Sequence, residues 1–350
     1  MERYYTRACN FYYGKESKTL VSKKKSLPLN GIKELSFDHI EIITRKSKKK
    51  ISIFNLNKLP KILKKKINLD LKKITQKKKN FANLNFQKLP NIMGVLNLTP
   101  DSFSDGGKYN NLIKGPNHAF EMFKLGANII DVGGESTRPG SKEVDKRLEW
   151  KRINRVLKSI CNKVPVSLDT RKSEIMEKGI KLGVKMINDV SGLQRDKKTK
   201  QIIKKYKIPF VIQHSKGTPE NMQNKPNYKN ELLDIYDFFE EKIKFLNSVG
   251  IKHREIIIDP GIGFGKNLKH NMNLITNISI FHSLGFPILV GNSRKRFIKE
   301  ISGKNDTKIR LGGTVASSIY LMMQGVQILR IHDVNELIQG IKVFKELTYN

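Results

Sequence analysis

The stretch IMGVLNLTPDSFSDGG, residues 92–107, changes within a few positions from an apolar sequence to a polar one. Its start, residues 92–96, is typical of a buried β-strand. The part that follows, Asn97–Gly107, holds an amide, three hydroxyls, two carboxylates and two glycines. A turn needs glycine or proline, but it does not need this density of hydrogen-bonding groups. The stretch is therefore either an ordinary polar loop or a loop that reaches a ligand.

Eight short apolar runs, of which this stretch holds the first, alternate with helix-length segments along residues 91–350. The runs are IMGVLN (92–97), NIIDVGG (128–134), VPVSLDT (164–170), KMINDV (185–190), IPFVIQH (208–214), EIIIDPG (255–261), FPILVGN (286–292) and QILRIHD (327–333). Such strands between helices are typical of a parallel sheet that is covered on both faces. Eight units predict an α/β fold, the (β/α)8 TIM barrel of about 250 residues, over residues 89–350. An open, doubly wound sheet is the alternative, but no glycine-rich dinucleotide fingerprint follows the first strand.

Polar residues stand at the carboxyl end of every one of these runs. They are Asn97, Asp131, Asp169, Asn188, His214, Asp259, the segment Asn292–Lys295, and Arg330 with His332. In a barrel all these ends face one rim, where the loops build the active site. Unpaired carboxylates and amides near a core cost stability. We therefore interpret them as ligand-binding groups, and the loop Asn97–Gly107 as part of the same site.

The chemistry of these residues indicates the kind of ligand. Carboxylates and amides suit a heterocycle edge with several N–H donors, because a carboxylate accepts two parallel hydrogen bonds from such an edge. Arg138, Lys295, Arg330 and His332 suit an anion such as a phosphate. Asn97 and the aspartates of the first loop offer oxygen ligands for Mg²⁺. Together they indicate transfer of a group from a phosphorylated leaving group.

Seven segments of residues 91–346 resemble the dihydropteroate synthases, the sulfonamide targets of folate biosynthesis. They are GVLNLTPDSFSDGG, IIDVGGESTRPG, SLDT, INDVSG, DPGIGFGKN, GNSRK and RIHDV, in the family's order. The resemblance implies a TIM barrel that is usually a homodimer. It implies a transferase that joins 6-hydroxymethyl-7,8-dihydropterin diphosphate to p-aminobenzoate, forming dihydropteroate and diphosphate. The family's mechanism is dissociative: diphosphate leaves first, and the arylamine captures a pterin cation.

The resemblance also implies roles for individual residues. Pterin recognition falls to Asp169, Asn188, Asp259, Lys295 and Arg330. The p-aminobenzoate and diphosphate contacts fall to Phe103, Thr137, Arg138, Pro139 and His332, while Asp105 closes over the site and Asn97 binds Mg²⁺. Of these, Lys295, Arg330, His332 and Asp105 are the expected catalytic residues.

Three positions depart from the family pattern, and two other functions remain as alternatives. Gln213 and Ser215 flank His214 where many relatives carry methionines. The resemblance therefore does not determine which side chains form the wall of the pterin pocket. Asn292 replaces part of a glycine–methionine pair, a change that we expect to be tolerated. A pterin-binding methyltransferase domain would lack the loops TPDSFSDGG and STRPG. A basic RNA-binding protein would need aromatic residues among its lysines.

Residues 1–88 form a basic extension in front of the predicted barrel. The whole chain has a net charge of +35, and residues 1–90 hold 24 Lys and Arg against 6 Asp and Glu. SFDHIEIITR (36–45) and ISIFNL (51–56) predict a hairpin. Residues 61–79 predict an amphipathic helix that packs on its own protein rather than on a membrane. Because every assigned site residue follows position 90, the barrel is expected to be folded and active without residues 1–80.

Composition excludes several other classes of protein. Lys, Asn and Ile are abundant together, which we interpret as a compositional drift and not as binding of a specific nucleic acid. Two distant cysteines, Cys9 and Cys161, form no disulfide framework and are consistent with a cytoplasmic protein. No apolar run approaches the roughly 18 residues of a membrane span.

Overall fold

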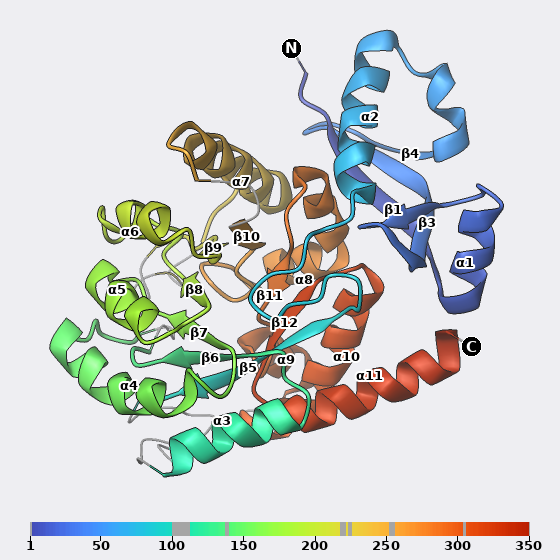
Figure 1. The fold of residues 1–350 in the computed structure, drawn as a ribbon. Helices are drawn as coiled ribbons and strands as arrows, with labels where there is room; N and C mark the ends of the chain where they lie inside the picture. Colours follow the sequence, from blue (N-terminus) through green and yellow to red (C-terminus); the bar gives the residue numbers. More distant parts are fainter. Residues whose placement is uncertain are drawn as a thin grey trace.

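The computed structural model describes residues 2–99, 113–136, 140–217, 222, 226–251, 256–303 and 306–349. It contains a barrel surrounded by helices and, beside it, a small sheet formed by the start of the chain, drawn in blue in Figure 1. The barrel strands are β5 (Asn91–Asn97), β6 (Ile129–Gly133), β7 (Val166–Asp169), β8 (Met186–Asp189), β9 (Phe210–Gln213), β10 (Ile256–Asp259), β11 (Leu289–Val290) and β12 (Ile328–Ile331).

All neighbouring barrel strands are parallel, in the order β10-β9-β8-β7-β6-β5-β12-β11. A parallel bridge between Ile258 and Ile288 joins the two ends of this order. There the Ile258 N–H donates to the Pro287 carbonyl oxygen at 3.0 Å. The predicted TIM barrel is confirmed, and each predicted run coincides with one strand to within a few residues.

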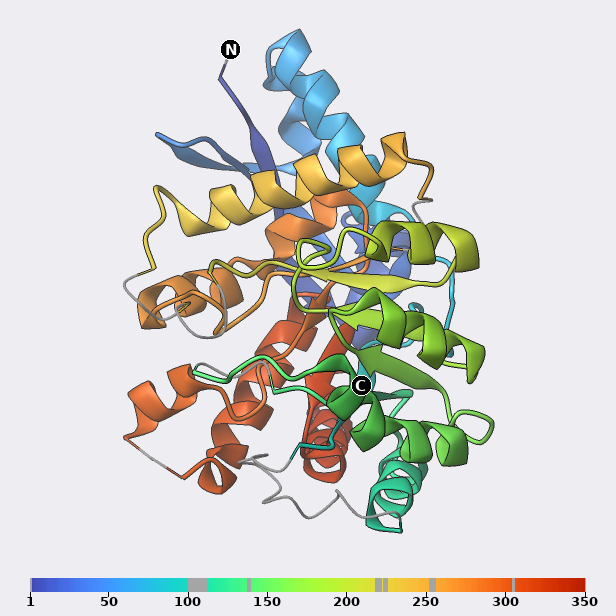
Figure 2. The same cartoon turned by 90° about the vertical axis from the view of Figure 1, so that its left-hand side faces the viewer.

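Helices surround this barrel, as Figures 1 and 2 show. They are α3 (Lys114–Lys124), α4 (Lys146–Ile160), α5 (Ser173–Lys181), α6 (Thr199–Tyr206), α7 (Glu231–Ser248), α8 (Leu268–Thr276), α9 (Arg296–Ser302), α10 (Leu311–Met323) and α11 (Val334–Tyr349). Two short 3₁₀ helices, η3 (Ile278–Leu284) and η4 (Lys308–Arg310), complete the outer layer.

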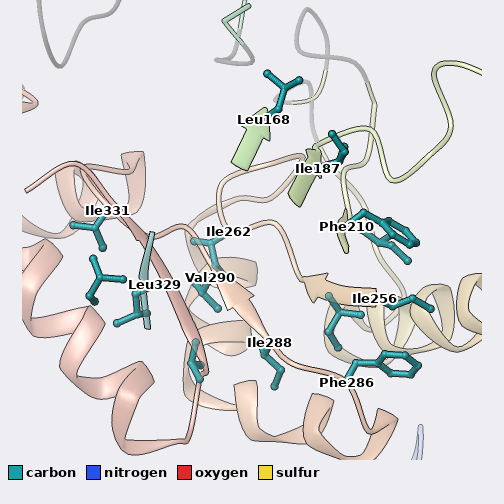
Figure 3. Packing of buried hydrophobic residues seen from close by; sticks show 14 of the residues in the cluster. Leu168, Ile187, Phe210, Ile256, Ile262, Phe286, Ile288, Val290, Leu329 and Ile331 are labelled. Atoms are coloured by element: carbon teal, nitrogen blue, oxygen red, sulfur yellow. The ribbon is translucent and has the colours of Figure 1, made fainter. Parts of the chain in front are cut away.

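Strand residues alternate between two apolar layers, which explains why the runs are apolar throughout. In β10, Ile256 and Ile258 pack in the layer between strands and helices, part of which is drawn in Figure 3. Ile257 belongs instead to a cluster inside the barrel that draws residues from seven strands. Leu84 and Phe86, from the segment before β5, join this inner cluster and are completely buried. Because that cluster lies near the strand starts, these two residues close the end of the barrel away from the polar rim.

The extension is a four-stranded antiparallel sheet with helices. Its elements are β1 (Tyr5–Tyr13), α1 (Gly14–Ser22), β2 (Leu27–Leu29), β3 (Ile32–Ile43), β4 (Lys48–Ser52), the 3₁₀ helix η1 (Ile53–Lys58) and α2 (Lys61–Thr75). Strand β3 pairs with the other three. Helix α2 buries Ile67, Leu71 and Ile74 in the extension's own core, as its periodicity predicts. The division between residues 88 and 89 stays a prediction.

The predicted hairpin is wrong in one of its strands, and the sequence argument missed β1, α1 and β2. The second strand is Lys48–Ser52, whose lysines tolerate the sheet edge because their side chains reach solvent. Most of ISIFNL forms η1 instead, where the Ser52 hydroxyl accepts a hydrogen bond from the Phe54 N–H. In the part of the chain that the structure describes, no helix is both long and apolar enough to cross a membrane.

The extension packs firmly on the outside of the barrel, beside α7 and η3 (Figure 2). Tyr5 lies in the main core, and its hydroxyl donates to Asp237 on α7 at 2.9 Å. The Ser279 hydroxyl on η3 donates to the Ala8 carbonyl at 2.9 Å. Lys78 is buried, and its ammonium donates to the carbonyls of Lys73 at 3.0 Å and Gly285 at 2.9 Å. Every residue of η3 is buried as a result of packing on both sides.

Candidate active site

Asp131, in the middle of β6, is the meeting point of polar residues from the last halves of β8 and β12, and Arg330 links it to Asp169 at the end of β7. The Arg330 guanidinium donates from Nε to Asp131 Oδ2 at 2.6 Å and from Nη2 to Asp169 Oδ2 at 2.8 Å. Asn188 Nδ2 also donates to Asp131 Oδ2, at 2.9 Å. The structure thus brings together three residues that were assigned to the pterin. It adds Asp131, which the sequence argument named at a strand end without giving it a role.

This cluster is buried and only partly paired. Burial raises the pKa of Asp169, against the lowering effect of Arg330, while the two carboxylates raise the pKa of Arg330 against the effect of burial. Asp131 Oδ1 and Asn188 Oδ1 have no hydrogen-bond partner among the described residues, and neither does Gln213 Nε2 at the end of β9. Buried polar atoms without partners are costly. Their position at the strand ends therefore indicates that a polar ligand completes them.

Asp259 ends β10 and is also buried. Its Oδ1 accepts the N–H of Gly261 at 2.8 Å. Burial raises the pKa of Asp259 to about 6, against this hydrogen bond and the nearby charges of Lys295, Lys266 and Arg330. Gly261 has a φ of +67°, and a Cβ there would stand 2.0 Å from the His214 carbonyl oxygen. The turn after Asp259 thus needs glycine to pass this close to β9.

Lys266 links the end of β9 to the loop between β10 and α8. Its buried ammonium donates to His214 Nδ1 at 3.1 Å, to the Phe264 carbonyl at 2.8 Å and to the His214 carbonyl at 3.4 Å. Burial lowers the pKa of Lys266 to about 7, and burial with Lys266 holds the pKa of His214 well below its usual range. His214 therefore stays neutral, and it joins two loops of the site.

Lys295 and His332 lie on neighbouring parts of the same rim. The Lys295 ammonium stands 4.1 Å from the centroid of the Phe264 ring. The Ser293 hydroxyl lies 3.0 Å from His332 Nδ1 and accepts the His332 N–H at 3.2 Å. Nearby, Asn292 Nδ2 donates to Ser318 on α10 at 2.8 Å. Asn292 thus ties the end of β11 to a helix, and its expected tolerance stays a prediction.

Asn97 ends β5 beside Gly133 of β6, and it remains the predicted magnesium ligand. Among the described residues, no group of three or more His, Cys, Asp or Glu is arranged to hold a metal ion. Mg²⁺ at phosphate-transfer sites takes one or two protein oxygens and fills its other positions with substrate phosphates and water. A single amide oxygen fits such an ion when a diphosphate is bound.

Five predicted site residues lie outside the described residues: Phe103, Asp105, Thr137, Arg138 and Pro139. Their roles stay predictions, as do the roles of the residues described above. Lys266 and Ser293 are not among the predicted site residues, although the motifs GIGFGK and GNSRK contain them. Only the fold shows that their side chains hold His214 and His332.

Comparison with known proteins shows the family and the fold of this chain. A family model described as pterin binding enzyme matches residues 93–332. The dihydropteroate synthase of Escherichia coli K12 is 40% identical over 256 residues, which are 73% of this chain and 90% of the relative. The solved Yersinia pestis enzyme, a sulfonamide drug complex, has a TM-score of 0.73 at 38% identity and covers 75% of this chain and 96% of its own.

A second solved structure, the dihydropteroate synthase of Xanthomonas albilineans with 4-aminobenzoic acid, has a TM-score of 0.68 at 34% identity. It covers 74% of this chain and 93% of its own. The family match starts within β5 and ends just after β12, so that it spans the barrel and leaves the extension out. By this match and by its identity to relatives along the whole barrel, the chain belongs to the family of pterin-binding enzymes, together with the dihydropteroate synthases.

Proposed function

We propose that this chain is a transferase of folate biosynthesis that joins 6-hydroxymethyl-7,8-dihydropterin diphosphate to p-aminobenzoate, giving 7,8-dihydropteroate and diphosphate. The observation that carries the proposal is the set of buried, partly unpaired carboxylates and amides at the strand ends. Such groups match the N–H donors of a pterin edge. The complexes of solved relatives with a sulfonamide and with 4-aminobenzoic acid support the second substrate.

The residues of this chain divide between the two ions of a dissociative reaction. Asp259 accepts hydrogen bonds from the aminopyrimidinone edge of the pterin, and Asn188 and Asp169 bind the same ring. The Arg330 guanidinium, held by two carboxylates, stacks on the ring. The carboxylates stabilise the positive charge that develops on the pterin, because they are fixed in a site shielded from water.

The departing diphosphate meets the cationic part of the rim. Lys295 and His332 face its negative charge, and Ser293 fixes the orientation of the His332 ring. Asn97 would hold Mg²⁺, which when bound would neutralise charge on the diphosphate. Arg138 completes the anion contacts. No side chain in this scheme forms a covalent bond to the substrate.

The arylamine enters from the side of the first two loops. Phe103 lies against its ring, and Thr137 with Pro139 shapes the pocket. Asp105 closes the first loop over the site. After diphosphate has departed with the electron pair of the broken C–O bond, the amine attacks the exocyclic carbon of the pterin cation, and the nitrogen of the new C–N bond loses one proton to diphosphate or water.

We also propose that the enzyme works as a homodimer in the cytoplasm. Helix α10 is unusual in this basic chain because it carries no charged residue over its 13 residues. Gly312, Ala316 and Tyr320 are exposed along one side of it. An uncharged helix face of this kind suits a second copy of the chain. Cys9 and Cys161 are both buried and free, which fits a reducing compartment.

A direct assay tests the activity. Purified full-length protein is incubated with the dihydropterin diphosphate, p-aminobenzoate and Mg²⁺, and the products are separated by chromatography. We expect dihydropteroate and diphosphate in equal amounts, and competition by a sulfonamide. Product formation only with a methylated folate as donor would favour the methyltransferase alternative instead.

A further inference from the structure

The extension contacts the barrel at one place that also supports the active site. Arg45 lies in the turn between β3 and β4. Its guanidinium donates from Nη1 to Asp234 Oδ1 at 2.7 Å and from Nη2 to Asp237 Oδ2 at 2.8 Å. Both aspartates are in the first two turns of α7. Helix α7 follows the loop that leaves β9, so that its start lies at the end of the barrel where the strands carry their polar residues.

Asp234 uses its other oxygen to hold that loop. Its Oδ2 accepts the backbone N–H groups of Lys229 at 3.1 Å and Asn230 at 3.3 Å, the two residues just before α7. One carboxylate therefore joins the extension on one side to the last residues before α7 on the other. Arg45 also separates the negative charges of Asp234 and Asp237, which stand three residues apart on one helix face.

The loop fixed in this way contacts the site through Tyr228. The Tyr228 hydroxyl donates to the Gly265 carbonyl at 2.8 Å, in the loop between β10 and α8. Its ring lies 6.2 Å from the His214 ring and 4.5 Å from the Lys216 ammonium. Gly265 is flanked by Phe264, whose ring lies under Lys295, and by Lys266, which holds His214.

We propose that the extension positions the pterin site: Arg45 fixes Asp234 and, through Tyr228, the β10–α8 loop against which Lys295 packs. The proposal rests on the proposed function, because it assigns the pterin diphosphate to this site. An exposed ion pair adds little to folding stability. Its effect here lies instead in ordering a loop before the substrate arrives, which lowers the entropy lost on binding.

Arg3 provides a matched control for Arg45. Both side chains are 42% exposed, and both pair with Asp237. Arg3 reaches further along α7, to Glu240 at 2.5 Å, while Arg45 reaches back to Asp234. Substitution of either arginine removes one cation between the extension and α7, but only the change at Arg45 releases Asp234.

The test compares Arg45→Met and Arg3→Met in the full-length protein. We expect Arg45→Met to raise KM for the dihydropterin diphosphate about threefold to tenfold with kcat within twofold, and Arg3→Met to change neither by more than twofold. Calorimetric titration of the same compound should give a matching rise in Kd for Arg45→Met, so that the result does not depend on turnover. The midpoint temperature of thermal unfolding should fall equally in both variants.

A second pair of variants tests the route through Tyr228. In a Tyr228→Phe background, Arg45→Met should change KM by less than twofold, because the contact through which it acts is already lost. Asp234→Asn, which keeps an acceptor for the loop N–H groups, should reproduce Arg45→Met. Equal effects of Arg3→Met and Arg45→Met, or an unchanged Kd in Arg45→Met, would overturn the proposal. Absence of turnover in the wild-type protein would instead contradict the proposed function.

Discussion

Asp259 is the residue on which pterin recognition is expected to depend most. Hydrogen bonds to a charged group are worth roughly 1.5–3 kcal/mol each. Asp259→Asn keeps the volume but turns one acceptor toward the ligand into a donor. We expect a loss of at least about 2–4 kcal/mol, roughly 30- to 1000-fold in kcat/KM. Steady-state kinetics at limiting pterin substrate measure it, and near-wild-type turnover would remove Asp259 from the site.

The pKa of Asp259 predicts opposite effects of pH on activity and stability. The pKa is about 6 in the folded protein and near 3.9 in an unfolded chain. Between these values the folded state alone holds the proton, so the stability that this proton contributes is present below about pH 4 and is lost as the pH rises through 6. Wild-type kcat/KM should therefore fall below pH 6, where the acceptor is protonated.

Denaturant unfolding checks the stability side of that prediction. Asp259→Asn should be more stable than the wild type at pH 8, and this difference should shrink at pH 5. A difference that stays constant between the two pH values would show that the Asp259 carboxyl does not titrate in this range.

The polar residues at the strand ends were predictable from the sequence, because the carboxyl ends of all strands in a parallel barrel lie at one rim. Which of these residues pair with one another was not predictable. Nothing in the run NIIDVGG says that Asp131, rather than Asp169, receives both Asn188 and Arg330. Lys266 was equally hidden, since its partner His214 is 52 residues away in the chain.

At the scale of elements, the β10–α8 loop depends on close approach to β9. Gly261→Ala would place a methyl group against the His214 carbonyl, and its φ of +67° disfavours any residue with a Cβ. We expect the loop to move, Asp259 and Phe264 to be misplaced, and kcat/KM to fall by at least about tenfold.

Gly303→Ala is a fitting control for that substitution. It shares the left-handed backbone, with a φ of +68°, but a Cβ there meets no atom within 4 Å. Loss of activity in Gly261→Ala together with near-normal activity in Gly303→Ala would locate the effect in the contact with β9. Equal losses would locate it in backbone strain alone.

Elements that repeat a simple pattern were the ones that sequence reasoning found. Each barrel strand is apolar on both sides because it packs on two layers, and helix α2 shows a regular apolar stripe. Strand β4 was not predicted, because a run of three lysines is more typical of a loop than of a strand. Strand β1 was not predicted, because the elements that it packs against, β3 and η3, are distant from it in the sequence.

For the whole molecule, the contacts of the extension change what we expect from its removal. The sequence predicted an active barrel without residues 1–80, but the structure buries Tyr5 and Lys78 against it. Removal would uncover apolar surface of the barrel, such as the Tyr236 ring on α7, which packs edge-on against Tyr5. We now expect a protein of residues 81–350 to be largely insoluble or to unfold at a clearly lower temperature.

Solubility and thermal unfolding of the shortened chain measure this outcome. Co-expression of residues 2–80 as a separate polypeptide is the control, and it should restore soluble protein. A shortened chain that stays soluble, active and as stable as the full-length protein would show that the barrel does not need the extension.

Strand β1 packs on η3, which the ribosome synthesises much later than the extension. About 200 residues separate the end of α2 from the start of η3. A ribosome that adds roughly 5–20 residues per second needs about 10–40 s to cover that distance. Throughout this interval the earliest part of the chain is outside the ribosome with one apolar face uncovered. Nascent chains that stop just before residue 278 should therefore bind chaperones or aggregate, whereas the completed chain, with η3 and all eight barrel strands in place, should not.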